Sequence, residues 1–190
     1  MNDPIGLWLT WYREAQDSLQ VDADAMALST CTQTAYPSVR ILYFRRLIEG
    51  KFCFFTNYTS HKGKDLADNP RAAAVFLWHP LGRQVNLEGN IEKLNARDSD
   101  DYFYKRSFES QLSAATSKQS QKLGAYQDFL DEIEANRKKF GDKVSRPGHW
   151  GGYALDPQSI EFWQQGEHRR HQREVYLKTS QGWDKELLYP

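Results

Sequence analysis

Hydrophobic residues near the start of the chain recur at the spacing of an α-helix. Asp3 is a typical N-cap residue, and Pro4 suits the first helical position. The apolar positions that follow are Ile5, Trp8, Leu9, Tyr12 and Ala15. This spacing predicts an amphipathic helix over residues 4–19.

Beyond this helix the pattern changes to short runs rich in β-branched and aromatic residues, which are typical of strands. Turn residues such as Glu49-Gly50 separate the runs and indicate hairpins. The predicted strands cover residues 26–32, 38–45, 51–56, 71–79, 83–94, 153–155, 159–163, 173–178 and 183–187, and further helices are predicted over 60–68, 97–107 and 121–140.

The order of these elements points to a barrel. Sequential strands joined by hairpins come first, a helical insertion at about 97–140 follows, and further strands occupy about 150–190. Sequential antiparallel strands favour a β-barrel over a parallel βαβ sheet. We therefore expect a mainly β fold with flanking helices, in a single domain that spans residues 1–190.

Charge and composition narrow the class of protein. The chain has 190 residues, with 25 Lys and Arg against 25 Asp and Glu, so its formal net charge is zero. Proteins that bind nucleic acid or anionic membranes usually carry a basic excess, so neither partner is expected. An anion site would have to arise from the local placement of cations. Aromatic residues make up 14% of the chain, which suits a pocket for a flat polar ring.

The cysteines and the N-terminus indicate where the protein works. Cys31 and Cys53 form no C-x-x-C motif, and we interpret both as small buried hydrophobic residues in a reducing compartment. The N-terminus has no basic stretch followed by an apolar segment, and no run approaches about 18 apolar residues. We therefore expect a cytoplasmic protein.

Residues 56–64 form the first candidate site. Hydroxyl-bearing side chains and Lys62 lie where a predicted strand meets a helix N-terminus, and free N–H groups, the helix dipole and a lysine together favour a phosphate there. An ordinary capped helix with solvated lysines is the alternative.

The second candidate site is the strand over 38–45, which contains two arginines. An arginine within an apolar strand is costly unless it is paired or bound to an anion. Strict alternation places Arg40 and Arg45 on opposite faces, so both could reach one ligand only through a bulge or from the strand end. The alternative is that both side chains extend from the strand ends into solvent.

The third candidate site is a helix that we expect to carry Tyr102, Arg106 and Ser110. Tyr102 and Arg106 are four residues apart and so share a helical face. Such a set can hold a phosphate ester, although Tyr/Arg pairs are also common on surfaces.

The fourth candidate site follows Trp163. Arg169, His171 and Arg173 alternate, so on a strand they would share one face and repel unless an anion lay between them. A solvated basic edge strand is the alternative. No metal site is expected, because the five histidines show no H-x-x-x-H spacing and no cysteine partner.

Taken together, these segments resemble the pyridoxamine/pyridoxine 5′-phosphate oxidase family over nearly the whole chain. The most specific piece is E-F-W-Q-Q-G-E-H-R-R-H-Q-R at 161–173, which is similar to the family signature E-F-W-x-x-G-x-x-R-x-H-x-R. Supporting pieces are R-I-L-Y-F-R at 40–45, F-F-T-N-Y-T-S-H-K at 54–62, N-P-R-A-A-A-V-F-L-W at 69–78, R-Q-V at 83–85, S-K-Q-S at 117–120 and W-G-G-Y at 150–153.

The resemblance implies an FMN-binding split β-barrel that works as a homodimer, with FMN at the subunit interface. It assigns the substrate phosphate to Tyr102, Arg106 and Ser110, with Arg45 touching both flavin and substrate. It places the catalytic pair Arg169 and His171 over the substrate ring. The FMN contacts that it implies are Arg40, Ile41, Leu42, Tyr43, Phe44, Arg45, Phe55, Thr56, His61, Lys62, Gln84, Gln119, Ser120, Trp163 and Arg173.

The implied reaction converts pyridoxamine or pyridoxine 5′-phosphate to pyridoxal 5′-phosphate. Hydride passes from the C4′ carbon of the substrate to the flavin, and molecular oxygen then takes up the electrons and forms hydrogen peroxide.

Three departures from the family pattern bear on substrate choice and turnover. Arg45 stands where the family usually has Lys, and His61 stands where an Arg is usual. The sequence also starts late relative to typical members, so we expect a site more open to water. Two alternatives therefore remain: a related FMN oxidase acting on another aromatic substrate, as in phenazine biosynthesis, and a flavin- or pyridoxal-phosphate-binding module with little turnover.

Overall fold

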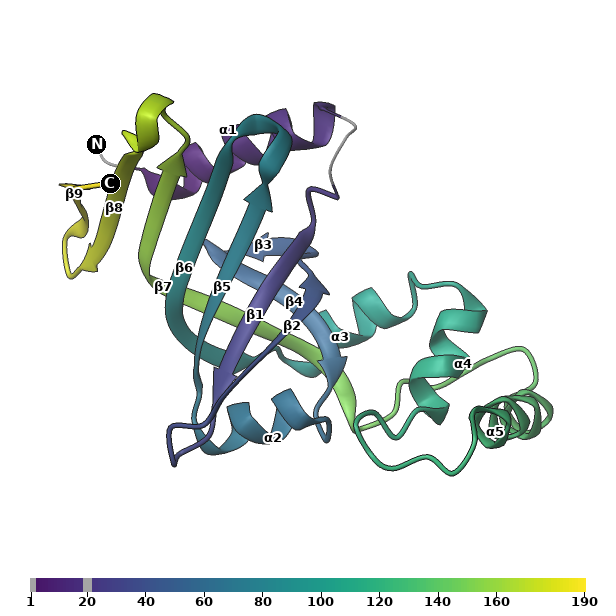
Figure 1. Cartoon of the computed structure of the whole chain (residues 1–190). Helices are drawn as coiled ribbons and strands as arrows, with labels where there is room; N and C mark the ends of the chain where they lie inside the picture. The colour runs from purple at the N-terminus through teal and green to yellow at the C-terminus, as the bar shows by residue number, and fades with distance from the viewer. Residues whose placement is uncertain (1–2, 19–21) are drawn as a thin grey trace.

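A computed structural model describes residues 3–18 and 22–190, and Figure 1 shows its strands curled around a common core. The strands are β1 (Ala25–Cys31), β2 (Pro37–Tyr43), β3 (Arg46–Ile48), β4 (Lys51–Asn57), β5 (Arg71–Trp78), β6 (Arg83–Lys93), β7 (Trp150–Gln164), β8 (Gln172–Thr179) and β9 (Gly182–Leu188). The helices are α1 (Pro4–Asp17), α2 (His61–Asp68), α3 (Ala96–Phe103), α4 (Phe108–Thr116) and α5 (Tyr126–Phe140), with short 3-10 helices η1 (His79–Leu81) and η2 (Glu167–Arg169).

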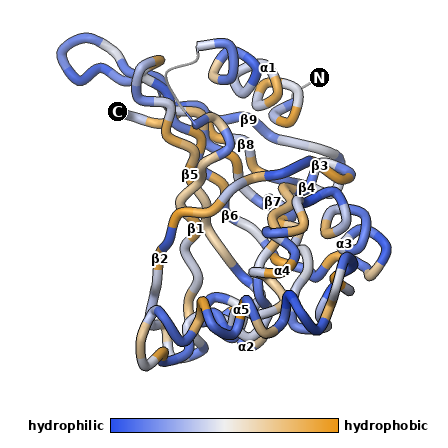
Figure 2. Tube along the Cα trace, turned by 90° about the vertical axis from the view of Figure 1, so that its right-hand side faces the viewer, coloured by the Kyte–Doolittle hydropathy of each residue, from blue (hydrophilic) through white to orange (hydrophobic). Residues whose placement is uncertain are grey.

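One antiparallel sheet joins the nine strands of the described residues. Seven of them follow the order β2-β1-β5-β6-β7-β4-β3, and β8 and β9 extend the sheet from β7. The expected mainly β barrel with flanking helices is therefore confirmed. Helices α3, α4 and α5 lie together beside one end of β7, while β8 and β9 lie beside its other end (Figure 1). The colours of Figure 2 show the hydrophobic residues concentrated along the strands, with α5 mostly hydrophilic.

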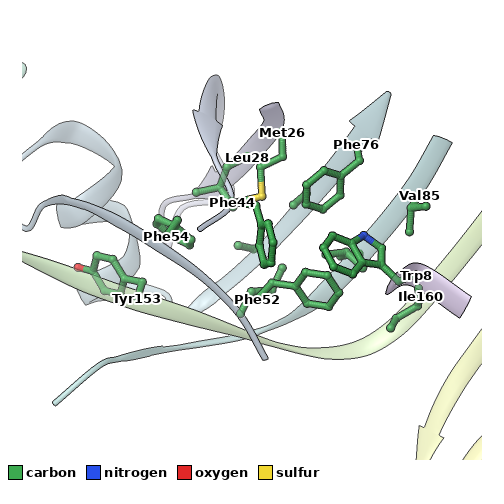
Figure 3. Packing of buried hydrophobic residues seen from close by; sticks show 14 of the residues in the cluster. Trp8, Met26, Leu28, Phe44, Phe52, Phe54, Phe76, Val85, Tyr153 and Ile160 are labelled. Atoms are coloured by element: carbon green, nitrogen blue, oxygen red, sulfur yellow. The ribbon is translucent and has the colours of Figure 1, made fainter. Parts of the chain in front are cut away.

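Helix α1 closes the barrel with an aromatic residue. Trp8 is completely buried, and its ring centroid lies 4.8 Å from Phe44, 4.9 Å from Phe52 and 5.5 Å from Phe76 (Figure 3). Replacing such a residue by alanine typically costs about 3–5 kcal/mol of stability. The N-cap is as predicted, because the Asp3 carboxylate accepts from the Gly6 amide at 2.9 Å. The last position of the helix predicted over 4–19 lies outside the described residues.

A bulge explains why β7 is one strand instead of the two predicted over 153–155 and 159–163. Its register with β6 shifts between Glu88 and Gly89, where Gly89 faces Pro157. A Cβ atom on Gly89 would lie 2.1 Å from the Asp156 carbonyl oxygen, so only glycine permits this close approach. Bulges accommodate proline within a sheet, and the strand continues through residues 156–158.

Four other features differ from the expectations drawn from the sequence. Strand β3 was not predicted, and β2 ends at Tyr43 instead of residue 45. Helix α4 was also missed. Both cysteines are free and Cys53 is buried, but Cys31 is only partly buried, because it belongs to the outward-facing set of alternating positions in β1. None of the described helices is long and apolar enough to cross a membrane.

Candidate active site

The largest concentration of predicted site residues lines one pocket of about 970 Å³. Strand β2, strand β4, the start of α2, the α3–α4 region and residues 117–120 form its walls. The predicted residues that it brings together are Arg40, Ile41, Leu42, Tyr43, Arg45, Phe55, Thr56, His61, Lys62, Tyr102, Arg106, Ser110, Gln119 and Ser120. Segments that are far apart in the sequence therefore form a single cavity.

The charge of this pocket differs from that of the whole chain. Its lining includes Arg40, Arg45, Lys62, Arg106 and His61, but no aspartate or glutamate. Because acids and bases are equal in number over the whole chain, the excess is local. A cavity lined by one sign of charge concentrates ligands of the other sign, so this pocket favours anions.

Lys62 is the most buried of these cations, with 8% of its surface exposed. Its Nζ donates to Thr56 Oγ1 at 3.1 Å, to Ser60 Oγ at 3.3 Å and to Gln119 Oε1 at 3.2 Å, all of them neutral acceptors. Burial, reinforced by the charge of Arg40, lowers the pKa of Lys62 to about 8. The strand-to-helix arrangement is as predicted, because the Ser60 hydroxyl caps α2 by accepting from the Gly63 amide.

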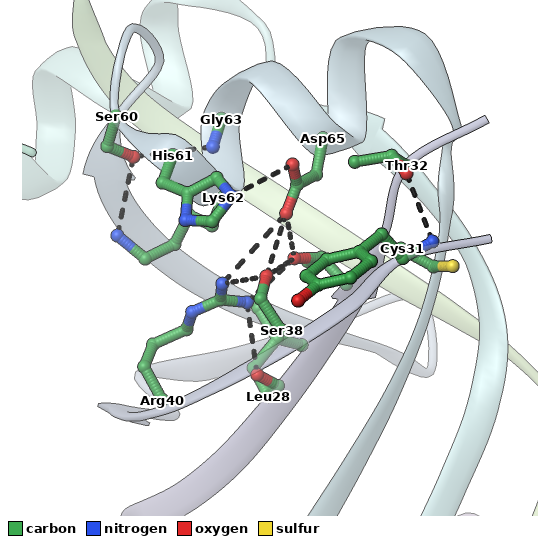
Figure 4. A network of polar contacts seen from close by, with 12 residues as sticks. Leu28, Cys31, Thr32, Ser38, Arg40, Ser60, His61, Lys62, Gly63 and Asp65 are labelled. Atoms are coloured by element: carbon green, nitrogen blue, oxygen red, sulfur yellow. Dashed lines mark hydrogen bonds and ion pairs between the residues drawn. The ribbon is translucent and has the colours of Figure 1, made fainter. Parts of the chain in front are cut away.

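A buried carboxylate behind the pocket orients its cations (Figure 4). Asp65 accepts hydrogen bonds from Thr30 at 2.6 Å and from Ser38 at 2.9 Å, and Arg40 donates to the same two hydroxyl groups. Burial raises the pKa of Asp65, but these hydrogen bonds and the nearby cations outweigh it, so the pKa lies below its usual value. The ring of His61 lies 3.6 Å from the other carboxylate oxygen.

Aromatic rings form another wall of the pocket. Phe55 stacks on Tyr102 with 3.9 Å between ring centroids and 12° between planes. Trp150 also stacks with Phe55, with 5.7 Å between ring centroids. The Arg106 guanidinium lies 4.8 Å above the Trp150 ring. Its Nη1 atom is buried and has no hydrogen-bond partner among residues 3–18 and 22–190, and burial lowers the pKa of this side chain. A buried donor without a partner is costly, so Arg106 is a candidate to bind an acceptor on a ligand.

The predicted helix carrying Tyr102, Arg106 and Ser110 is wrong, although all three residues line the pocket. Helix α3 ends at Phe103, Arg106 lies in the connection, and Ser110 lies in the first turn of α4. The Ser107 hydroxyl accepts from the Ser110 amide at 3.3 Å and so starts a new helix. The pocket, and not a shared helical face, brings these residues together.

The arginines of 38–45 do not lie on opposite faces of one strand, because β2 ends before Arg45. Arg40 and Arg45 therefore both line the pocket. The side chain of Phe44, in contrast, is 4% exposed and packs against Trp8 in the core. Phe44 can contribute to the pocket only through its main chain.

The remaining predicted residues form a second group, away from the pocket. Gln84 pairs with Trp163, and Trp163 pairs with Arg173, on the adjacent strands β6, β7 and β8. The His171 ring centroid lies 4.5 Å from that of Trp163. Neither these four residues nor Arg169 lines the pocket. Arg173 donates to Glu161 at 2.7 and 3.0 Å, so the anion beside it is a carboxylate of the same chain.

The expected common strand face of Arg169, His171 and Arg173 is also wrong. Arg169 belongs to η2, His171 precedes β8, and Arg173 lies within that strand. His168 and Arg169 have positive φ angles of 53° and 65°, which residues other than glycine seldom adopt. Backbone strain of this kind clusters at functional sites, so it supports a functional role for this turn.

Comparison with known proteins explains both groups of residues. Residues 13–139 match the model of the pyridoxamine 5′-phosphate oxidase family, and residues 150–190 match that of the pyridoxine 5′-phosphate oxidase C-terminal dimerisation region. The chain belongs to the pyridoxamine 5′-phosphate oxidase family. The predicted residues that line the pocket all fall in the first match, and the signature segment at 161–173 falls in the second.

Relatives in this oxidase family match over most of their length. The chain is 43% identical to a pyridoxine/pyridoxamine 5′-phosphate oxidase of Wolbachia pipientis wMel over 190 residues, which covers 99% of this chain and 88% of the relative. The chain is also 42% identical to a pyridoxine/pyridoxamine 5′-phosphate oxidase of Ehrlichia ruminantium, in a match that covers 99% of this chain and 98% of that relative.

Solved structures show the same fold. PhzG from Burkholderia lata 383, determined with tetrahydrophenazine-1-carboxylic acid, superposes with a TM-score of 0.94 at 27% identity, covering 100% of this chain and 94% of that one. A pyridoxamine 5′-phosphate oxidase-related, FMN-binding protein from Nostoc punctiforme superposes with a TM-score of 0.80 at 16% identity, with both chains fully covered.

Sequence reasoning assigned no individual role to several residues of this oxidase-family pocket. Those that line it or orient its cations are Ser38, Asn57, Asp65, Ser107, Ser113, Ser117 and Trp150. Ser38 had a usable signal, because it lies two residues before Arg40 and therefore on the same strand face. Asp65 had none, since its role depends on how α2 packs against β1 and β2. No group of three or more His, Cys, Asp or Glu residues suited to a metal lies within 3–18 and 22–190.

Proposed function

We propose that this chain is an FMN-dependent oxidase that converts pyridoxine or pyridoxamine 5′-phosphate to pyridoxal 5′-phosphate, with oxygen as acceptor and hydrogen peroxide as product. The observation that carries the proposal is the acid-free pocket, lined by four Arg and Lys side chains and a histidine beside stacked aromatic rings. Cofactor and substrate both join a phosphate to a flat ring, so this lining suits them both. We expect the enzyme in the cytoplasm.

The pocket residues fit FMN. Lys62 is buried with only neutral hydrogen-bond partners, and a phosphate would supply the negative charge that this site lacks. Bound FMN supplies the acceptor for a hydride and passes the electrons on to oxygen. On this chain we assign FMN to Arg40, Ile41, Leu42, Tyr43, Arg45, Phe55, Thr56, His61, Lys62, Gln119 and Ser120.

A second copy of the chain would complete the site. Gln84, Trp163 and Arg173 lie away from the pocket of their own chain, so we propose that each protomer contributes them to its partner's FMN. The outward-facing side chains of β2 support such a contact, because Val39 and Ile41 are 69% and 66% exposed. Apolar side chains exposed next to one another mark interaction surfaces. The match of residues 150–190 to a dimerisation region points the same way.

The substrate is held by its phosphate and by its ring. Arg106, whose buried Nη1 has no partner among the described residues, would donate to the substrate phosphate together with Arg45 and the hydroxyl groups of Tyr102 and Ser110. Arg169 and His171, from the partner protomer, would orient the substrate ring. The Gly166 amide donates to Nδ1 of His171 at 3.3 Å, which leaves Nε2 to face the substrate. These residues bind and orient the substrate, and none of them needs to carry a proton in the oxidation itself.

A peroxide assay tests this function. The FMN-loaded protein should form hydrogen peroxide and pyridoxal 5′-phosphate from at least one of the two vitamin B6 phosphates, and light scattering should show a dimer with one FMN per subunit. The fold similarity to PhzG favours a tetrahydrophenazine carboxylic acid as the competing substrate. Turnover of that compound alone would replace the proposal by the phenazine-type alternative, and no turnover of either would leave a binding module.

A further inference from the structure

Arg45 reaches the pocket from a main chain that is fixed on both sides. Its amide donates to the Cys53 carbonyl oxygen at 2.9 Å, and the amide of Phe44 donates to the carbonyl oxygen of Asp24 at 2.9 Å. The guanidinium lies 4.7 Å above the ring of Tyr43. Its charge contributes to lowering the pKa of Arg106, so the two arginines act on the same region of the pocket. Two such cations repel each other, so Arg45 needs a stabilising contact to stay in this position.

Asp24 is the side chain that holds Arg45. Its Oδ2 lies 3.4 Å from Arg45 Nη1, and it is the only hydrogen-bond partner of this guanidinium among residues 3–18 and 22–190. Its other oxygen, Oδ1, accepts from the Tyr12 hydroxyl at 2.5 Å. Asp24 does not itself line the pocket, and the guanidinium keeps N–H groups free for an anion.

Helix α1 fixes the carboxylate in turn. Tyr12 stacks on the buried Trp8 with 4.6 Å between ring centroids, and its hydroxyl accepts from Gln16 Nε2 at 3.0 Å. Burial, followed by the hydrogen bond to Asp24, raises the pKa of Tyr12, so it remains a donor. A chain of contacts thus runs from the core of the barrel through Tyr12 and Asp24 to Arg45.

We propose that Asp24 and Tyr12 are positioning residues. They hold the Arg45 guanidinium against the pocket and thereby raise its affinity for the phosphate of the substrate and product. This inference rests on the proposed function for the identity of the ligand. A direct effect of the Asp24 carboxylate on the bound phosphate would instead weaken binding. A carboxylate near an anion site repels the anion, so Asp24 can favour phosphate binding only through Arg45.

A double-mutant cycle on the FMN-loaded protein tests the proposal, with equilibrium dialysis against pyridoxal 5′-phosphate as the binding readout. Asp24→Asn should raise the Kd about two- to fivefold, the range for a partly exposed ion pair, and Tyr12→Phe should act in the same direction. In the Arg45→Ala background, Asp24→Asn should cause no further loss of affinity for pyridoxal 5′-phosphate. Asp24→Glu should restore part of the affinity. Glu92→Gln, which breaks the Lys51–Glu92 pair away from the pocket, is the matched control and should change nothing.

The results separate this proposal from the proposed function. In peroxide assays Asp24→Asn should raise KM by the same factor and leave kcat within about twofold, which a general loss of structure would not do. If Asp24→Asn leaves the Kd unchanged or tightens binding, or if it weakens binding equally with and without Arg45, the positioning role is refuted. If the wild type binds pyridoxal 5′-phosphate but forms no peroxide, the oxidase function fails while the cycle still decides the role of Asp24.

Discussion

FMN affinity should fall steeply above pH 8, because the anion site depends on a buried lysine. Lys62 is 8% exposed, has only neutral hydrogen-bond partners, and has a pKa lowered to about 8 by burial and by the charge of Arg40. A bound phosphate favours the charged lysine, so the bound state keeps a proton that the free protein loses above this pH. The Kd should therefore rise by a factor of about 10 between pH 7 and pH 9, equivalent to about 1.4 kcal/mol.

Fluorescence titration of FMN into the apoprotein between pH 7 and pH 9.5 measures this dependence. The phosphate is already a dianion over this range, so its own titration contributes little. Lys62→Arg is the matched control, because arginine stays charged throughout, and it should flatten the profile even if it binds less tightly. A wild-type Kd that stays constant up to pH 9, or an identical slope in Lys62→Arg, would refute the reasoning.

Three further predictions concern individual side chains. Arg106→Ala should raise KM for pyridoxamine 5′-phosphate about 10- to 100-fold while FMN is retained, because a charged hydrogen bond is worth about 1.5–3 kcal/mol. Steady-state kinetics at saturating FMN will measure this change, and an unchanged KM would exclude the phosphate contact. Arg169→Ala should keep FMN bound but lower peroxide formation by about 100-fold through lost orientation; wild-type turnover in this variant would remove Arg169 from the site. His61→Ala should weaken FMN binding, because His61 lines the pocket and we assign it to FMN; an unchanged Kd would show that His61 does not contact the cofactor.

The amino-acid sequence by itself determined the elements with strong local signals. Alternating apolar runs separated by turn residues predicted most strands of the barrel, and the Asp3 and Ser60 caps marked where α1 and α2 begin. Such signals are local, because they depend on side chains only a few residues apart. The signature at 161–173 and the shorter motifs indicated the family and most residues of the pocket, including Lys62 and Arg106.

Only the tertiary structure decided how these residues are combined. Spacing placed Tyr102, Arg106 and Ser110 on one helix, whereas α3 ends at Phe103 and Ser107 caps α4, so Arg106 lies in the connection and only the pocket joins the three. Alternation placed Arg169, His171 and Arg173 on one strand, whereas a turn with positive φ angles separates them. The carboxylates of Asp24 and Asp65 carried no signal in the sequence, because each acts on a cation from another element. Contacts between distant segments depend on packing, and packing is set by the whole barrel and not by any local pattern.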